Sequence, residues 1–121
     1  MPSHSNIQIK RIYEPAGKQD GYRILVDRLW PRGIKKENAR LDEWNKELAP
    51  STALRKWFHE GKGSFQEFAT RYKKEMNGQE AELMRVKALS KERKVTLLYG
   101  LRDETQNHAA LLRDILDHLK P

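Results

Sequence analysis

The segment 22–33 places a short apolar strand directly before a run of charged and aromatic residues, and this arrangement constrains the fold most strongly. Residues 24–26 (Ile-Leu-Val) are uninterrupted by polar side chains, which is typical of a strand covered on both faces of a sheet. Pro31 cannot donate a backbone hydrogen bond and Gly33 permits unusual backbone angles, so the strand ends before them. Open α/β sheets bind ligands at the carboxyl ends of such strands. The segment therefore predicts a ligand site, without indicating the ligand or a reaction.

A second buried strand is predicted at residues 95–99, where Val, Thr, Leu, Leu and Tyr stand in succession. The chain between the two strands has apolar residues at helical spacing and two helix starts, at Ser51 and at a capping box formed by Ser64 and Glu67. If the two strands are parallel in one sheet, their carboxyl ends emerge at the same edge. The predicted fold class is α/β, with a small, largely parallel sheet of three to four strands flanked by about five helices.

Other elements are predicted from shorter patterns. Residues 7–13 read as a strand, and the loop after them is short, so an antiparallel pair with the central strand is expected. Residues 42–48 have helical spacing, which predicts a short helix with Trp44 pointing inward. The remaining expectations are a left-handed C-cap at Gly78, a helix at 80–89, a basic loop at 90–94, and a last helix capped by Asp103 that runs nearly to Pro121.

The composition describes a single domain, residues 1–121, in which residues 1–6 are expected to form a flexible tail. Lys and Arg number 24 against 17 Asp and Glu, and the net charge of +7 favours acidic partners such as nucleic acid or phosphorylated metabolites. The lack of cysteine excludes disulfides, thiol nucleophiles and thiolate metal sites. No apolar run reaches the about 20 residues of a membrane span, and the polar start lacks a signal peptide. A cytoplasmic protein without a membrane partner is therefore expected.

Charged and polar residues follow both buried strands, and we expect them to face each other across one crevice. The candidate ligand-binding residues are Arg28, Trp30 and Arg32 after the first strand, and Tyr99, Arg102, Asp103, Asn107 and His108 at the end of the second strand and after it. Arg32 and Arg102 are the preferred anion ligands, because loop arginines can present a bidentate fork to phosphate or carboxylate. Asp27 and His108 are the candidates for catalysis by acid–base chemistry.

Each candidate also has a structural interpretation. Asp27 and Arg28 could form a salt bridge at the strand end, because buried charges need partners. Trp30 could plug the core, the commoner fate of Trp, or form a flat wall for a ligand ring. Asn107 could cap the last helix, and a lone His such as His108 is more often structural than catalytic. The sequence has no glycine-rich phosphate loop, metal-ligand spacing or nucleophile–histidine motif, so no cofactor or metal is predicted.

Several blocks of the sequence resemble the bacterial family known as domain of unknown function 488, in its short YeaO-like branch. These blocks are residues 11–13, 21–33 (which include Trp-Pro-Arg-Gly), 47–52, 54–58, 96–99, 102–103 and 107–109. The resemblance implies a small α/β protein and no known reaction. Longer relatives often have Cys-His-Arg where this chain has Asn107-His108-Ala109. Chemistry that depends on that thiol and that arginine is therefore not implied for this chain.

The preferred hypothesis is a cleft at the carboxyl ends of the strands that binds, and could turn over, a small anionic ligand such as a nucleotide or phosphorylated metabolite. One alternative is a nucleic-acid-binding or regulatory module that uses the basic segment 28–40, in which five cations stand against Glu37. A second alternative is a module that binds a protein partner and has no pocket chemistry. The sequence favours none of the possible oligomeric states.

Overall fold

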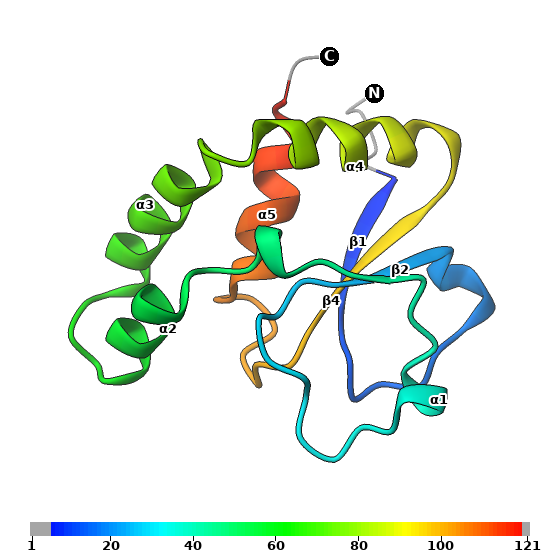
Figure 1. Cartoon of the computed structure of the whole chain (residues 1–121), viewed down its shortest axis with the longest axis horizontal. Coiled ribbons are helices and arrows are strands. Elements are labelled where there is room, and N and C mark those ends of the chain that lie inside the picture. Colours follow the sequence, from blue (N-terminus) through cyan, green and yellow to red (C-terminus); the bar gives the residue numbers. More distant parts are fainter. Residues whose placement is uncertain (1–5, 120–121) are drawn as a thin grey trace.

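Four parallel strands form the sheet at the centre of the structure, in the order β1-β4-β2-β3. The computed structural model describes residues 6–119 (Figure 1). The strands are β1 (Ile7–Arg11), β2 (Tyr22–Leu25), β3 (Glu43–Trp44) and β4 (Val95–Tyr99). This arrangement confirms the predicted α/β class and the parallel pairing of the two apolar strands, β2 and β4.

The central position of β4 in the sheet explains why its sequence does not alternate between apolar and polar residues. All five of its residues are buried, because β1 and β2 flank it and both faces of the sheet are covered. Val95, Leu97 and Tyr99 face the larger core, while Leu98 joins a smaller core on the opposite face. The register pairs Leu97 with Ile9 of β1 and with Ile24 of β2.

The helices are α1 (Lys36–Ala39), α2 (Thr52–His59), α3 (Phe65–Met76), α4 (Glu80–Glu92) and α5 (His108–Asp117), with short 3-10 turns η1 (Lys18–Asp20) and η2 (Lys46–Leu48). Helices α2 to α5 cover the larger core, and loops together with the short helix α1 cover the smaller one. In Figure 1, α4 runs across the top, α2 and α3 lie at the left, and α1 lies apart at the lower right. Ser51 caps α2 and the capping box of Ser64 and Glu67 begins α3, as the sequence predicts. Within residues 6–119, no helix combines the length and apolar character needed to cross a membrane.

The predicted antiparallel hairpin between the first two strands is wrong. β1 pairs in parallel with β4, and β4 separates β1 from β2. The loop between β1 and β2 crosses β4 without an α-helix, through η1, and the Thr96 hydroxyl of β4 donates a hydrogen bond to the Asp20 carbonyl at 2.6 Å. A short connection can therefore join parallel strands here because its backbone is bonded to the strand that it crosses.

The helix predicted at residues 42–48 is also wrong, because the backbone of this segment bonds to the edge of β2. The amides of Asp42 and Asn45 donate to the carbonyls of Arg23 and Leu25, at 2.9 and 2.8 Å, which produces β3. Trp44 is 36% exposed rather than pointing inward. Only residues 46–48 form a 3-10 turn, which the Asn45 side chain caps.

Three smaller predictions are corrected at the helix ends. Gly78 has no left-handed backbone, and α3 ends at Asn77 in a right-handed conformation. Residues 90–92 extend α4 instead of forming a loop. The N-cap of α5 is Asn107, not Asp103, and the helix ends at Asp117; the final two residues lie outside the described chain, as do residues 1–5 of the expected tail.

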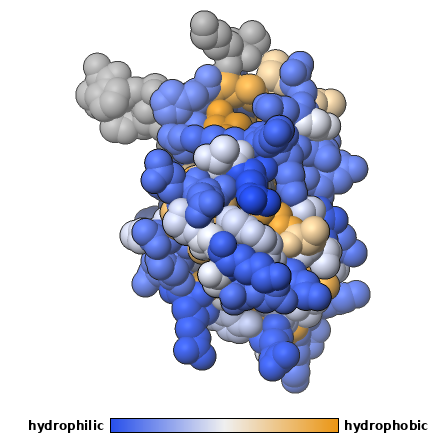
Figure 2. Space-filling model, turned by 90° about the vertical axis from the view of Figure 1, so that its left-hand side faces the viewer, coloured by the Kyte–Doolittle hydropathy of each residue, from blue (hydrophilic) through white to orange (hydrophobic). Residues whose placement is uncertain are grey.

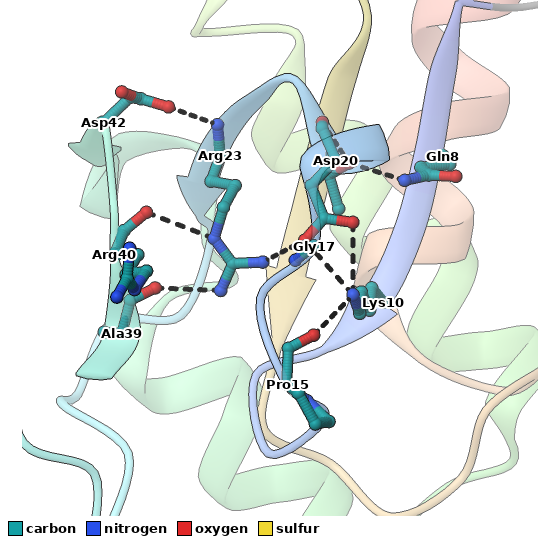
Figure 3. A network of polar contacts seen from close by, with 10 residues as sticks. Gln8, Lys10, Pro15, Gly17, Asp20, Arg23, Ala39, Arg40 and Asp42 are labelled. Carbon is teal, nitrogen blue, oxygen red and sulfur yellow. Dashed lines mark hydrogen bonds and ion pairs between the residues drawn. The ribbon is translucent and has the colours of Figure 1, made fainter.

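A buried ion network holds the first three strands together (Figure 3). Arg23, only 4% exposed, donates to the Asp20 carboxylate and to the carbonyls of Ala39 and Arg40. Lys10 of β1 contacts both carboxylate oxygens of Asp20 at 3.1 Å. The Asp42 carboxylate accepts from the backbone amide of Arg23 at 2.8 Å. Each buried charge therefore has partners from several segments, which is the condition for its being tolerated in a core.

Gly21 precedes β2 in a conformation that excludes other residues. Its φ is +65°, and a Cβ there would lie 2.3 Å from the Lys94 carbonyl oxygen. We expect Gly21→Ala to lower the free energy of unfolding by about 3 kcal/mol, from backbone strain and a backbone clash together. Gly61→Ala is the matched control, since Gly61 has φ +70° with nothing within 4 Å. Urea denaturation that gives equal losses for both variants would contradict this account.

Asp20 predicts an acid-dependent contribution to stability. Burial opposes its ionisation, but hydrogen bonds from Gly17, Lys10 and Arg23 outweigh burial and lower the pKa of the carboxyl below its ordinary value of 3.8. The stabilisation is therefore complete above that ordinary value and is lost as pH falls through the lower, folded-state pKa. Asp20→Asn should be less stable than wild type at pH 7, and the difference should shrink towards pH 2 in thermal unfolding. Asp117→Asn, at an exposed position, should track wild type at every pH.

Candidate functional site

A cavity of about 360 Å³ lies at the carboxyl ends of β2 and β4, where the predicted site was placed. The loop after β2, the helices α2 and α3, and the loop leading into α5 surround it; in Figure 1 these segments come together at the lower left. Its lining residues are Tyr13, Asp27, Arg28, Leu29, Trp30, Arg32, Pro50, Arg55, Phe58, His59, Phe68, Gly100, Leu101 and His108. The cavity thus combines aromatic and aliphatic walls with several cations and one carboxylate.

Two other depressions are helical grooves far from the strand ends. One of about 760 Å³ lies between α2 and α3, and one of about 450 Å³ lies among α3, α4 and α5. Figure 2, which shows the left-hand side of the molecule, is mostly hydrophilic with hydrophobic side chains gathered near the top of the view. Neither groove has buried polar groups of the kind that line the cavity at the sheet edge, so the cavity is the better candidate for a ligand site.

Asp27 connects the ends of both central strands to the start of α5. One carboxylate oxygen, Oδ2, accepts from the backbone amide of Gly100 at 2.9 Å. The other, Oδ1, is buried and lies 2.9 Å from His108 Nε2, although the direction is poor for a hydrogen bond. His108 Nε2 is also 2.9 Å from the Val26 carbonyl oxygen. Because a carbonyl oxygen only accepts, Nε2 carries a proton and donates it to Val26, while Asp27 Oδ1 lies close by without a hydrogen bond.

Gly100 allows this arrangement because it has no side chain. A Cβ at Gly100 would lie 3.0 Å from Asp27 Oδ2 and 3.9 Å from the Tyr13 ring. Such a contact is too tight for a carboxylate that already bonds to the Gly100 amide. The glycine after β4 therefore permits the close approach of Asp27, which the sequence alone did not indicate.

Arg28 holds the start of α2 instead of pairing with Asp27. Its guanidinium donates to the carbonyls of Pro50 at 3.1 Å and Ala49 at 3.4 Å. Within the described chain, Asp27 and Arg28 form no salt bridge, so the structural pairing considered for them is absent. Arg28 still lines the cavity, and its charge faces the same space as the other cations.

The least engaged basic side chains of the cavity are Arg32, Arg55 and His59, which are all exposed. None of the three forms an ion pair with any residue in 6–119. Arg55 and His59 lie one turn apart on α2 and were not among the predicted site residues. Because residues four apart lie on the same face of a helix, the sequence could have indicated that these two side chains lie together. The sequence could not show that this face would lie against the loop after β2.

The structure separates the other predicted residues from the cavity. Arg102 is exposed, and the Asp103 carboxylate stabilises its own loop by accepting from the amides of Gln106 and Thr105, which lower its pKa. Asn107 caps α5 through Ala110, and Tyr99 is buried in the core, where burial raises its pKa. These four residues shape the loop after β4 but do not line the cavity. Trp30 fits both of its interpretations, because it packs on the smaller core and also lines the cavity.

The donor atoms of the site do not suggest a metal centre. Across residues 6–119, no group of three or more His, Asp or Glu side chains is placed to hold a metal ion. The cavity offers one carboxylate, and its oxygens already face Gly100 and His108. The geometry is therefore that of a pocket with more basic side chains than carboxylates, in which one oxygen of the partly buried Asp27 bonds to the Gly100 amide.

The comparisons with known proteins identify the family of this chain. The model of the family described as "Inactive DUF488-N3 subclade" matches residues 6–120, and the chain belongs to this family. The uncharacterised protein YeaO of Escherichia coli K12 is 52% identical, over 94% of this chain and 99% of its own length. The uncharacterised protein Rv3073c of Mycobacterium tuberculosis H37Rv is 38% identical, over 97% and 98%. No solved structure matches significantly. The resemblance to the YeaO-like branch is thus confirmed.

We expect Asp27→Asn to lower the free energy of unfolding by about 1–3 kcal/mol, the usual penalty for an unsatisfied buried polar group. Asp27 Oδ2 accepts from the Gly100 amide and Oδ1 lies 2.9 Å from His108 Nε2, so an amide in place of the carboxylate turns an NH2 group towards one of these two N–H groups. Asp103→Asn is the control, because a single oxygen of Asp103 accepts all of its bonds and an amide can replace it. If chemical denaturation gives the same midpoint for both variants, Asp27 does not connect the strands as described.

Proposed function

We propose that the cavity binds a small anionic ligand, such as a nucleotide or phosphorylated metabolite, and does not transform it. The observation that supports this most directly is the convergence of Arg32 and Arg55, beside His59, on a cavity with a single carboxylate, Asp27, whose Oδ2 already accepts from the Gly100 amide. Uncompensated cations around a concave site raise the local potential and attract anions. Arginine forks suit phosphate or carboxylate groups in particular.

The arrangement of Asp27 and His108 favours binding over catalysis. A general base needs an atom within hydrogen-bond reach of a substrate proton. The Asp27 oxygens and His108 Nε2 instead face each other and two backbone groups, from Gly100 and Val26. The description of the family as inactive supports the same proposal. We therefore assign Asp27 and His108 the task of holding the cavity wall in place.

The two alternatives from the sequence predict different behaviour. Nucleic-acid binding relied on the basic segment 28–40, but Arg28 of this segment donates to the carbonyls near α2. Lys35, Lys36 and Arg40 are exposed and do not line the cavity. A protein partner would instead cover a broad surface. Binding of a small ligand would depend only on the basic side chains that line the cavity. We place the protein in the cytoplasm, where such metabolites occur.

Arg55→Ala and Arg32→Ala should each weaken anion binding about 10- to 100-fold, which corresponds to the about 1.5–3 kcal/mol of a hydrogen bond to a charged group. Both variants should keep the stability of wild type within about 0.5 kcal/mol, because the two side chains are exposed. The measurement is titration with phosphate, AMP, ATP and ribose 5-phosphate, followed by thermal shift and by the fluorescence of Trp30, which lines the cavity.

Arg102→Ala is the matched control, since Arg102 is an exposed arginine at the same edge outside the cavity. If Arg102→Ala loses anion binding and Arg55→Ala keeps it, the ligand binds at the loop after β4 and not in the cavity. Duplex DNA binding with a log–log salt slope of about −4, abolished by Lys35→Ala with Lys36→Ala, would favour the nucleic-acid alternative. If no compound shifts wild type at millimolar concentration, the proposal is refuted.

A further inference from the structure

We infer that the ligand carries an aromatic ring beside its anionic group, an inference that rests on the proposed function and narrows its ligand class. The cations of the cavity account only for recognition of charge. The same cavity also has an apolar side that is exposed to solvent. Recognition of an anion does not explain that exposure.

The exposed apolar side chains are concentrated at this cavity. Among residues 6–119, three large hydrophobic side chains are exposed: Tyr13 at 43%, Leu29 at 58% and Trp44 at 36%. Tyr13 and Leu29 line the cavity, and Trp44 packs edge-on against Trp30, which also lines it, with ring centroids 5.2 Å apart. Scattered apolar residues on a surface are ordinary, whereas a cluster beside polar groups marks an interaction site.

Tyr13 is held in place before any ligand binds. Its hydroxyl donates to the Arg32 carbonyl at 2.8 Å, and the Arg11 guanidinium lies 4.9 Å from the centre of its ring. Arg11 is itself fixed by the carbonyls of Leu101 and Gly100, at 2.7 and 3.3 Å. The ring is therefore a preorganised flat surface, and a preorganised surface binds a ligand ring with little loss of side-chain freedom.

Trp30, in the loop after β2, is also held in place by a hydrogen bond. Its Nε1 donates to the Ile34 carbonyl at 2.7 Å, so the indole cannot rotate freely. Aromatic surfaces stack on rings of any base and gain little from a sugar or a bare phosphate. The volume of about 360 Å³ is at the small end of ligand pockets, which suits one ring with one anionic group.

The test compares ligands that share an anion and differ in the ring. Binding of AMP, ribose 5-phosphate, inorganic phosphate and adenosine is measured by calorimetry on the full chain. We expect AMP to bind at least tenfold more tightly than ribose 5-phosphate, and adenosine to bind more weakly than AMP. Tyr13→Leu should remove most of the preference for AMP, while the control Tyr13→Phe loses the hydroxyl bond to Arg32 but keeps the ring and its contact with Arg11, and should retain most of the preference.

The outcomes separate this inference from the function on which it rests. If ribose 5-phosphate or phosphate binds as tightly as AMP, the ring inference is overturned and the anion site stands. If none of the four compounds binds, the proposed function fails first. If Tyr13→Leu leaves the preference for AMP intact, or instead abolishes self-association seen by sedimentation, the exposed aromatic cluster serves another purpose and the inference is overturned.

Discussion

The buried guanidinium of Arg23 is the interaction on which the arrangement of the first half of the chain depends. A charge at 4% exposure is tolerated only when hydrogen-bonding partners surround it. Arg23 takes these partners from η1 and from the carbonyls of residues 39–40 at the end of α1. The Asp42 carboxylate binds the backbone of the same residue. One residue of β2 therefore determines where the chain enters β2 and where it returns as β3.

The backbone of Arg40 adopts an unfavourable conformation at the point where its carbonyl bonds to the Arg23 guanidinium. Arg40 is the only residue other than glycine with a positive φ within the described chain, +48°. That conformation is unfavourable for an arginine by about 1 kcal/mol, and it coincides with a carbonyl that bonds to Arg23. The strain is offset because an unpaired guanidinium in this position would cost more than the strained backbone. Satisfaction of the buried charge thus decides the course of the loop that ends at β3.

The sequence predicted the features that depend on local pattern and missed those that depend on distant backbone partners. The unbroken apolar runs of β2 and β4 and the capping box at Ser64 were sufficient for the fold class and for the edge of the sheet at which the cavity lies. The segment 42–48 was misassigned because the free edge of β2 competes for its amides, which no local pattern reveals.

The same reasoning explains which site residues were found. Arg32 and His108 follow the ends of strands, so their neighbourhood followed from parallel pairing. Arg55 and His59 reach the cavity from α2, and the carbonyls of Ala49 and Pro50 just before that helix bond to Arg28. Arg102 follows a strand as well, but the turn around Asp103 leaves it exposed and outside the cavity. Position after a strand predicts the edge of the sheet, and loop hydrogen bonds decide which side chains face the cavity.

The distribution of polar groups in the cavity separates support from recognition. Asp27 and the buried His108 lie close to each other, and each bonds to the backbone of a central strand or its end, so the hydrogen bonds they make lie within the fold. The cations without a carboxylate partner in the described chain, Arg32 and Arg55, lie at the exposed side of the cavity beside Tyr13 and Leu29. A site organised for proton transfer would present its titrating groups to the ligand. The proposed binding of a ligand therefore rests on a cavity in which Asp27 and His108 support the wall, while cations and aromatic rings form the outer surface.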